Sequence, residues 1–410
     1  MGHQDHAAPA SFREVFAVGE FRALWSAELL SIMGDQLARV ALSVLVFDRT
    51  GSAGLTALTY ALTYLPDVVG GPLLAGLADR YPRRTVMVTS DLLRAALVAG
   101  MAVPGMPIAV IAVLLVLARL ANSPFAAAQA AILPTVLTGD RYVLGQTIRQ
   151  ITNQTAQLAG FAGGGVVVAV LGPSQALAGD ALTFLVSAVL IGVGVRRRSA
   201  PAADDGPRSL LRQLSAGARI IWGDRRLRSL VGLAWLAGFL IVPEGLAAPY
   251  AHEIGEGAVA VGVLLAAQPA GTVIGAFVLG RLVPPSQRLT VIGVLAVLAM
   301  LPLIGYAAKP ALLPAVALLA LSGACGAYQV IAGATFMRLV PDSGRGQAFG
   351  LAGSGLIAIQ GAGLAAGGLL ATVAGSASAA IALAGGIGAV VAVLAALTWY
   401  RARTEGTAVL

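Results

Sequence analysis

The sequence predicts an all-α membrane protein of twelve transmembrane helices, arranged as two pseudo-symmetric bundles of six. Hydrophobic residues make up 58% of the 410 residues and charged residues only 11%, whereas about a quarter of the residues of a soluble domain are charged. Apolar runs of about 20 residues, the length that crosses a bilayer as a helix, recur along the chain. Their approximate centres are Leu37, Leu65, Leu97, Leu115, Gly160, Val186, Leu240, Thr272, Val297, Leu318, Gly363 and Val390.

Positive charge predicts how these helices are oriented. Of the 27 basic residues, 21 lie at the two termini or in the alternate gaps that share their side of the membrane. The other gaps hold two, Arg49 and Lys309, and four arginines lie within the apolar runs. Because cytoplasmic loops keep the excess of arginine and lysine, both termini are expected in the cytoplasm. The net charge of +8 is then a topology signal, and no nucleic-acid partner is predicted.

Few residues of the chain suit catalysis or metal binding. Cys325 is the single cysteine and there are three histidines, which excludes an intrachain disulfide and a cysteine-based metal site. No phosphate-binding loop of the Gly-x-x-x-x-Gly-Lys-Ser/Thr type occurs, so ATP is not the expected energy source. The first 20 residues are polar and include Glu14 and Glu20, so no cleavable signal peptide is evident. We expect a monomer in the lipid bilayer with no cofactor and no enzymatic activity.

The polar stretch near the middle of the chain divides it into domains. Its opening, residues 199–207, is typical of a flexible linker. Leucine, alanine and isoleucine then recur at helical spacing between arginines, which predicts an amphipathic helix on the inner membrane surface; these residues are Leu210, Leu211, Leu214, Ala218 and Ile221. The predicted divisions are a cytoplasmic N-terminal segment 1–20, a six-helix bundle 21–195, a cytoplasmic linker 196–228, a second six-helix bundle 229–400 and a cytoplasmic tail 401–410.

The two halves of the chain look like repeats of one unit. Gln157 to Gly172 aligns without gaps on Gln360 to Gly375, and three further glycines match at the same offset, Gly160 with Gly363, Gly164 with Gly367 and Gly165 with Gly368. Duplicated helical units are the architecture of many secondary transporters, whose binding site lies between the repeats near the bilayer midplane. Coincidence in a chain rich in glycine and alanine stays open as the alternative.

Charged residues within the first apolar run are candidates for ion or proton binding. Glu28 and Asp35 are seven residues apart and share a helical face, and Arg39 lies one turn beyond Asp35. A carboxylate at membrane depth must be paired or protonated, so we expect Asp35 to exchange an ionic partner for a proton. A structural pair between Asp35 and Arg39 that never titrates is the alternative. Glu28 lies nearer the cytoplasmic end and could be hydrated.

Further polar residues at membrane depth predict a cavity that a small molecule and protons enter. Glu244 lies between Pro243 and Gly245, where we expect a broken helix. Asp180 is expected near the outer end of the sixth helix, in a structural or gating role. The other candidates for the cavity are Asp67, Arg119, Asn122, Arg149, Asn153, Gln157, Tyr328, Gln329 and Gln360.

The stretch Gly76 to Arg84, GLADRYPRR, resembles the loop between the second and third helices of the major facilitator superfamily, with Pro82 where that pattern has its second glycine. The resemblance implies a conformational gate. In it Gly76 lets two helices approach, and Asp79 acts at a helix end with Arg80, Arg83 and Arg84. A plain charge cluster that ends a membrane span is the alternative.

Two other motifs of the same superfamily are approximated. Gly160-Phe161-Ala162-Gly163-Gly164 resembles an antiport motif that has a proline at the second position, and its small residues, Gly160 and Gly164 among them, permit a pliant helix interface. Arg119 with Asn122 and Ser123 resembles the Arg-x-x-Gln-Gly pattern of drug/proton antiporters.

Stretches 21–25, 31–35 and 177–184 resemble the exporter branch that includes enterobactin and macrolide efflux proteins. That resemblance implies a multi-pass protein of the bacterial inner membrane that exports hydrophobic or amphipathic small molecules, of drug or siderophore type, in exchange for protons by alternating access. A lipid or lysolipid translocator and a nutrient importer of the same fold stay open.

Overall fold

The computed structural model describes residues 11–74, 76–199 and 210–407, and all regular secondary structure within them is helical. The first half comprises α1 Phe12–Ala17, α2 Gly19–Thr50, α3 Ala53–Ala61, α4 Leu65–Leu74, α5 Leu77–Arg80, α6 Arg83–Met101, α7 Ile108–Val136, α8 Asp140–Leu171 and α9 Pro173–Gly194. The second half comprises α10 Leu210–Gly223, α11 Arg225–Trp235, α12 Ala237–Leu240, α13 Val242–Gly245, α14 Ala247–Glu253, α15 Ala258–Leu282, α16 Pro285–Ile304, η1 Gly305–Ala308, α17 Leu312–Gly326, α18 Tyr328–Leu339, η2 Asp342–Gly344, α19 Arg345–Ala374 and α20 Ala377–Thr407.

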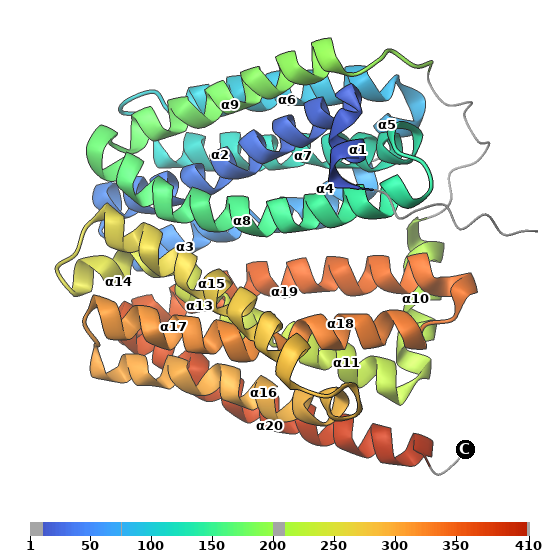
Figure 1. Cartoon of the computed structure of the whole chain (residues 1–410). Helices are drawn as coiled ribbons and strands as arrows, with labels where there is room; N and C mark the ends of the chain where they lie inside the picture. The colour runs from blue at the N-terminus through green and yellow to red at the C-terminus, as the bar shows by residue number, and fades with distance from the viewer. Residues whose placement is uncertain (1–10, 75, 200–209, 408–410) are drawn as a thin grey trace, which may run out of the picture.

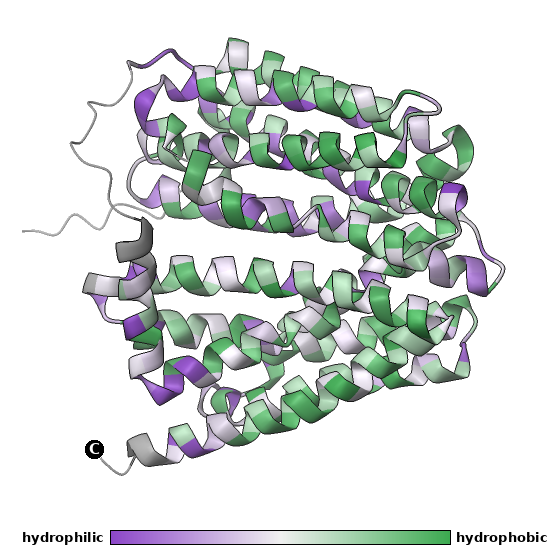
Figure 2. Cartoon of the chain, turned by 180° about the vertical axis from the view of Figure 1, so that it is seen from behind, coloured by the Kyte–Doolittle hydropathy of each residue, from purple (hydrophilic) through white to green (hydrophobic). Residues whose placement is uncertain are grey.

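The two halves lie side by side as two helix bundles, the first above the second in Figure 1. The helices α1, α5 and α10 lie at one end of the molecule with the last turns of α20, and we call this the terminal end. The opposite, or far, end holds α14 and the turn between α8 and α9. Hydrophobic residues cover the lengths of the helices, whereas hydrophilic residues gather towards both ends (Figure 2).

Ten helices of the described residues are long and apolar enough to cross a membrane. The predicted spans near Leu65 and Leu97 do not reach that standard. The first is divided into α3 and α4 by a turn at 62–64. The second, α6, carries Arg83, Arg84, Asp91 and Arg94 within 19 residues. All twelve predicted centres lie in helices, but the number of spans and the side of the termini stay predictions.

The seventh predicted span is broken where the sequence predicts a break. Turns at Leu236, Ile241 and Leu246 separate α11, α12, α13 and α14. The four-residue helix α13 consists of Val242, Pro243, Glu244 and Gly245. Proline has no backbone N–H to donate and glycine weakens a helix, so a fold that buries this segment leaves the helix discontinuous beside Glu244.

Matched glycines of the two repeats occupy matched packing positions. A Cβ atom on Gly160 would lie 2.8 Å from Cβ of Gln36 on α2, and one on Gly363 would collide with α12 at Gly238. Another matched pair, Gly165 and Gly368, instead faces the opposite half. Their Cβ atoms would approach α15 at Gly262 (2.9 Å) and α3 at Ala57 (2.7 Å). Equivalent positions therefore meet equivalent helices, as a duplicated unit requires.

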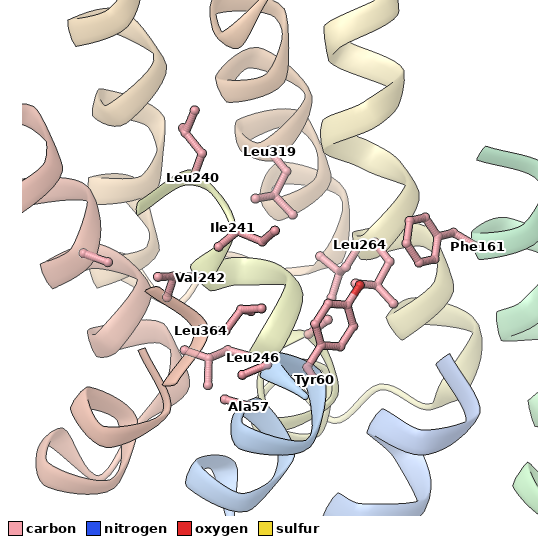
Figure 3. Close-up of a cluster of buried hydrophobic side chains, with 14 of the residues drawn as sticks. Ala57, Tyr60, Phe161, Leu240, Ile241, Val242, Leu246, Leu264, Leu319 and Leu364 are labelled. Atoms are coloured by element: carbon pink, nitrogen blue, oxygen red, sulfur yellow. The ribbon is translucent and has the colours of Figure 1, made fainter. Parts of the chain in front are cut away.

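Apolar packing joins the halves between the middle of the bundle and the far end. Gly54 of α3 lies against Gly368 of α19, and Phe47 of α2 packs edge-on against His252 of α14 with ring centroids 5.3 Å apart. Figure 3 shows side chains of both halves within one buried cluster. Its labelled members are Ala57, Tyr60 and Phe161 of the first half and Leu240, Ile241, Val242, Leu246, Leu264, Leu319 and Leu364 of the second.

The segments outside the two bundles are also helical where they are described. The predicted linker helix is α10, which packs on α19, where Gly217 lies against the backbone of Gln347. The expected flexible part, 199–207, lies outside the described residues except for Ser199. The helix α20 continues past the predicted boundary at 400 as far as Thr407, and the cytoplasmic tail at 401–410 stays a prediction.

Candidate functional site

Asp35 lies at the centre of a charged cluster inside the first half. Both carboxylate oxygens of Asp35 accept hydrogen bonds from Nη2 of Arg94 on α6 at 3.1 Å. Nη1 of Arg119 on α7 lies 3.8 Å from Asp35 Oδ2. The Asp35 side chain is 26% exposed and that of Arg94 only 3%. The carboxylate is thus paired twice, yet its own surface is partly open.

The remaining groups of the cluster hold the two arginines in place. Arg119 donates to Asp67 of α4 at 2.6 Å. Arg94 lies 3.6 Å from Asp91, one turn earlier on α6, and Asp91 in turn accepts a hydrogen bond from Ser187 of α9 at 2.6 Å. Bidentate and shared ion pairs of this kind offset the cost of burying charge. The predicted candidates Asp67 and Arg119 are therefore direct neighbours of Asp35 or of its partner.

Arg39 is not the partner that helical spacing suggested for Asp35. Its guanidinium lies 4.9 Å from the ring centroid of Tyr64 and 5.8 Å from that of Tyr60, and it donates to the Tyr64 hydroxyl at 3.2 Å. A cation over an aromatic face is a favourable, desolvated arrangement. The alternative of a structural pair between Asp35 and Arg39 is corrected accordingly, because Arg94 and Arg119 supply the counter-charges.

The tyrosine pair connects the charged cluster to the second half. The Tyr60 hydroxyl donates to Oε2 of Glu244 at 3.0 Å, across the junction between α3 and α13. Glu244 also lines a cavity of about 350 Å³ in the second half, which Gln329 and Gln360 share. Arg39, the two tyrosines and Glu244 thus form a continuous polar path from the first bundle into the second.

Glu28 belongs to a separate ion pair nearer the terminal end. Arg149 of α8 donates to Glu28 at 2.6 Å from Nε and at 2.8 Å from Nη2. The same guanidinium donates to Gln129 and Gln146, each at 3.2 Å. This bidentate pair joins α2 to α8, so the idea of a merely hydrated Glu28 is corrected.

The other cavity candidates differ in their surroundings. Asn122 and Gln157 are half-buried, and Asn153 is exposed. Tyr328 is fully buried and its hydroxyl donates to the carbonyl of Leu233 at 2.8 Å, a bond within the second half that fixes packing. Within the described part of the chain, no group of three or more His, Cys, Asp or Glu side chains is arranged to hold a metal ion.

The loop between α4 and α6 ties helices of the first half together. Arg83 donates to the carbonyl of Ala131 on α7 at 2.8 Å, and Arg84 donates to the carbonyl of Gly192 on α9. Asp79 and Arg80 are exposed. A Cβ on Gly76 would meet nothing within 4 Å, so the expected close approach of two helices at Gly76 is not present in this conformation.

Two residues of the cluster were missed or misplaced by sequence reasoning. Arg94, one of the four arginines that lie within the apolar runs, is the main partner of Asp35. Asp180, expected near the outer end of its helix, lines the same small cavity as Asp35, Arg94 and Arg119. One feature of the sequence could have indicated that Asp35 and Asp180 lie close together. Gly34 and Gly179 each precede one of these aspartates, and glycine lets helices pack closely.

The arrangement suits the binding of a proton or a cation more than covalent chemistry. Carboxylates alternate with guanidiniums at membrane depth, and such groups mark ion pathways and proton relays. The second-half cavity adds amides and one carboxylate among apolar side chains, the composition of a small-molecule site.

Known proteins resemble this chain in sequence and in fold. A model described as the Major Facilitator Superfamily matches residues 24–315. The multidrug efflux pump Tap of Mycobacterium tuberculosis is 29% identical over 216 residues, which are 50% of this chain and 51% of the pump. Macrolide efflux protein A of Streptococcus pyogenes is 30% identical over 77 residues, 19% of each chain.

The chain therefore spans about half the length of the first relative and about a fifth of the second. Among solved structures, a bacterial homologue of the human lysosomal transporter Spinster, in an inward-facing and unoccupied conformation, has a TM-score of 0.70 at 14% identity. The match covers 96% of this chain and 99% of that one. At this identity the likeness is one of fold.

Proposed function

Because the chain belongs to the major facilitator superfamily, whose members are multi-pass membrane transporters, we propose that it exports hydrophobic or amphipathic small molecules in exchange for protons. The observation that carries this proposal is the placement of Asp35. It is a partly exposed carboxylate at mid-helix, held between the buried Arg94 and the half-buried Arg119, and a polar path leads from this cluster to Glu244 in the other half.

Proton coupling follows from the electrostatics of that placement. Asp35 is ionised while Arg94 and Arg119 face it. Any movement of α2 against α6 or α7 that lengthens these pairs leaves a carboxylate at membrane depth, where a bare charge costs at least about 2.5 to 3.5 kcal/mol. Taking up a proton removes that cost. Helix movement and protonation are then linked, and each biases the other to the same extent.

Alternating access is supported by where the halves touch. The contacts between α8 and α15 and between α3 and α19 lie from mid-bundle to the far end and depend on glycines that face each other. Apart from the hydrogen bond between Tyr60 and Glu244, this junction is apolar, so it can separate without breaking an ion pair of the described residues. The distribution of arginines predicts that the terminal end faces the cytoplasm. On that orientation we propose that the site opens inward in the conformation described and that the far-end junction opens in the outward one.

The substrate class rests on the character of the second-half cavity and on the relatives. Leu240, Ile241 and Val330 line that cavity together with Glu244 and three glutamines, Gln268, Gln329 and Gln360. This lining suits a hydrophobic molecule with a few polar groups. The sequence relatives named above are efflux proteins, which supports export. We place the protein in the bacterial inner membrane as a monomer.

Transport by purified protein in liposomes tests the proposal. A lipophilic fluorescent dye is supplied outside, and a pH gradient of either sign is imposed. Dye should accumulate against its gradient only when the lumen is more acidic, and a protonophore should abolish the accumulation. Equal dye movement with and without the gradient would refute proton coupling. Movement of a labelled lysolipid, but of no dye, would instead favour the lipid translocator.

A further inference from the structure

We propose that Asp180 holds a proton in this conformation and exchanges it with Asp35 through the movement of Arg94. The inference rests on the proposed function and adds a second proton-carrying residue to the same site. Asp180 takes part in none of the ion pairs described above, and its surroundings differ from those of every other carboxylate in the cluster.

Asp180 is buried without a cation in contact. Its residue is 1% exposed. Oδ1 accepts a hydrogen bond of 3.3 Å from the hydroxyl of Thr183, one turn along α9, and the buried Oδ2 has no hydrogen-bond partner among the described residues. An ionised carboxylate in such a place carries a desolvation cost of several kcal/mol, and no ion pair of the described residues offsets it. The neutral carboxylic acid largely avoids that cost.

Close helix packing brings Asp180 to the cluster. A side chain at Gly34 of α2 would collide with Oδ1 of Asp180 and with the hydroxyl of Thr183, so the glycine allows α2 and α9 to meet at this point. Asp180 then lines a cavity of about 30 Å³ that Asp35, Arg94 and Arg119 also line. A space of that size is enough for a single water molecule, which can relay a proton between two carboxyl groups.

The balance of charge around this cavity favours a bound proton. The groups from all the packed elements are Asp35 and Arg39 on α2, Asp67 on α4, Asp91 and Arg94 on α6, Arg119 on α7 and Asp180 on α9. Four carboxyl groups thus face three guanidiniums, and Glu244 beyond the tyrosine pair adds a further carboxyl group. Neutrality needs at least one proton, and Asp180 is the carboxyl group of the cluster that contacts no guanidinium among the described residues.

The exchange conserves charge at each stage. Before it, Asp180 is protonated and Arg94 pairs with ionised Asp35. The proton then leaves an Asp180 oxygen and reaches an Asp35 oxygen, while the Arg94 guanidinium turns from Asp35 to Asp180. Afterwards Asp35 is neutral and Arg94 pairs with ionised Asp180. Asp35, whose side chain is 26% exposed, can pass the proton to bulk solvent, whereas the buried Asp180 can reach only the water of the shared cavity.

Infrared spectroscopy of the purified protein tests this directly, without any substrate. A protonated carboxyl group in dry surroundings gives a C=O stretching band that moves when hydrogen is replaced by deuterium. We expect wild type to show such a band near neutral pH and Asp180→Asn to lack it. Glu28→Gln, which alters the separate pair with Arg149, should keep the band. Retention of the band by Asp180→Asn, or its loss in Glu244→Gln instead, would overturn the assignment.

Asp35→Asn tests the exchange itself. Arg94 is then free to turn to Asp180, so we expect Asp180 to ionise and the band to disappear although Asp180 is intact. Persistence of the band in Asp35→Asn would overturn the exchange through Arg94. Thermal unfolding of each variant checks that the isosteric change leaves the protein folded. These spectra do not depend on transport, so a failure of the proposed export would be visible separately in the liposome assay.

Discussion

The hydroxyl of Tyr60 in the first half donates a hydrogen bond to Oε2 of Glu244 in the second half, at a distance of 3.0 Å. Tyr60 belongs to the apolar junction, since it is buried beside Ala57 and Leu264 (Figure 3). Its hydroxyl therefore joins the halves at the point where the polar path from Asp35 crosses between them. A bond in this position stabilises the conformation in which the junction is closed.

Tyr60→Phe removes this bond and leaves the ring. Loss of a buried hydrogen bond to a carboxylate should cost the closed junction roughly 1 to 3 kcal/mol, which shifts the ratio of the two conformations about 5- to 150-fold towards far-end opening. Distances between spin labels on the two halves measure that shift. Tyr328→Phe is the matched control, because its hydroxyl bond to Leu233 lies within one half and should leave the distances unchanged. Equal changes in the spin-label distances of the two variants would show that the Tyr60 hydroxyl does not specifically hold the halves together.

Gly165→Ala should keep the far-end junction from closing fully. The added Cβ would lie 2.8 Å from the carbonyl oxygen of Ala258 and 2.9 Å from Cα of Gly262, both backbone atoms that cannot rotate away. Overpacking of this kind costs about 1 to 3 kcal/mol. Spin-label distances between α8 and α15 should lengthen. Gly163→Ala serves as the control on the same helix, since its Cβ would meet nothing within 4 Å. Similar spin-label distances in both variants would show that the contact at Gly165 does not control closure of the junction.

Much of the fold follows from composition, while the pairing of charges does not. Apolar length, the offset between matched glycines and the proline and glycine around Glu244 predict the helices, the repeat and the broken span. The partner of Asp35 comes from a helix 59 residues away, and that of Glu28 from one 121 residues away. The spacing of residues within one helix does not predict pairs between helices. It indicated Arg39 as the partner of Asp35 because Arg39 lies one turn away on the same helix.

The behaviour of Arg39 shows why local spacing misleads here. Two aromatic rings from the chain segment after α2 offer its guanidinium a flat, desolvated face, and Arg94 is already bidentate to Asp35. Gly76 was likewise expected to mediate a close approach that is absent in this conformation. Both depend on tertiary packing, which only the folded chain displays.

Asp79→Asn is expected to act on the conformational equilibrium and not on ligand contacts. Asp79 is exposed at the terminal end, on the short helix α5, and is not among the residues that line the cavity of Glu244. If its carboxylate secures the outward-open state by joining the halves at this end, the substitution should favour the inward-open state by about 1 to 3 kcal/mol. Spin-label distances at the terminal end would report this. An unchanged distribution would refute the gating role proposed for the loop.

Asp35→Asn should separate transport from coupling. The amide mimics the neutral carboxyl group and cannot release a proton. We expect the variant to fold and to exchange ligand down a gradient, but to lose uphill transport driven by pH. Ligand affinity measured against pH should also lose its inflection. Full concentrative transport by the variant would show that Asp35 has only a structural role. The coupling residue would then have to be Asp180, Glu244 or Glu28.

Proton movement driven by substrate is the most direct test of the central claim, which is that substrate and proton exchange for each other through the Asp35 cluster. Liposomes containing the protein and a pH-sensitive dye begin without a pH gradient and receive a lipophilic substrate on one side only. Because coupling is reciprocal, wild type should move protons against the direction of substrate flow and create a pH difference, while Asp35→Asn should pass substrate with none. Substrate flow through wild type with no change in internal pH would contradict the account.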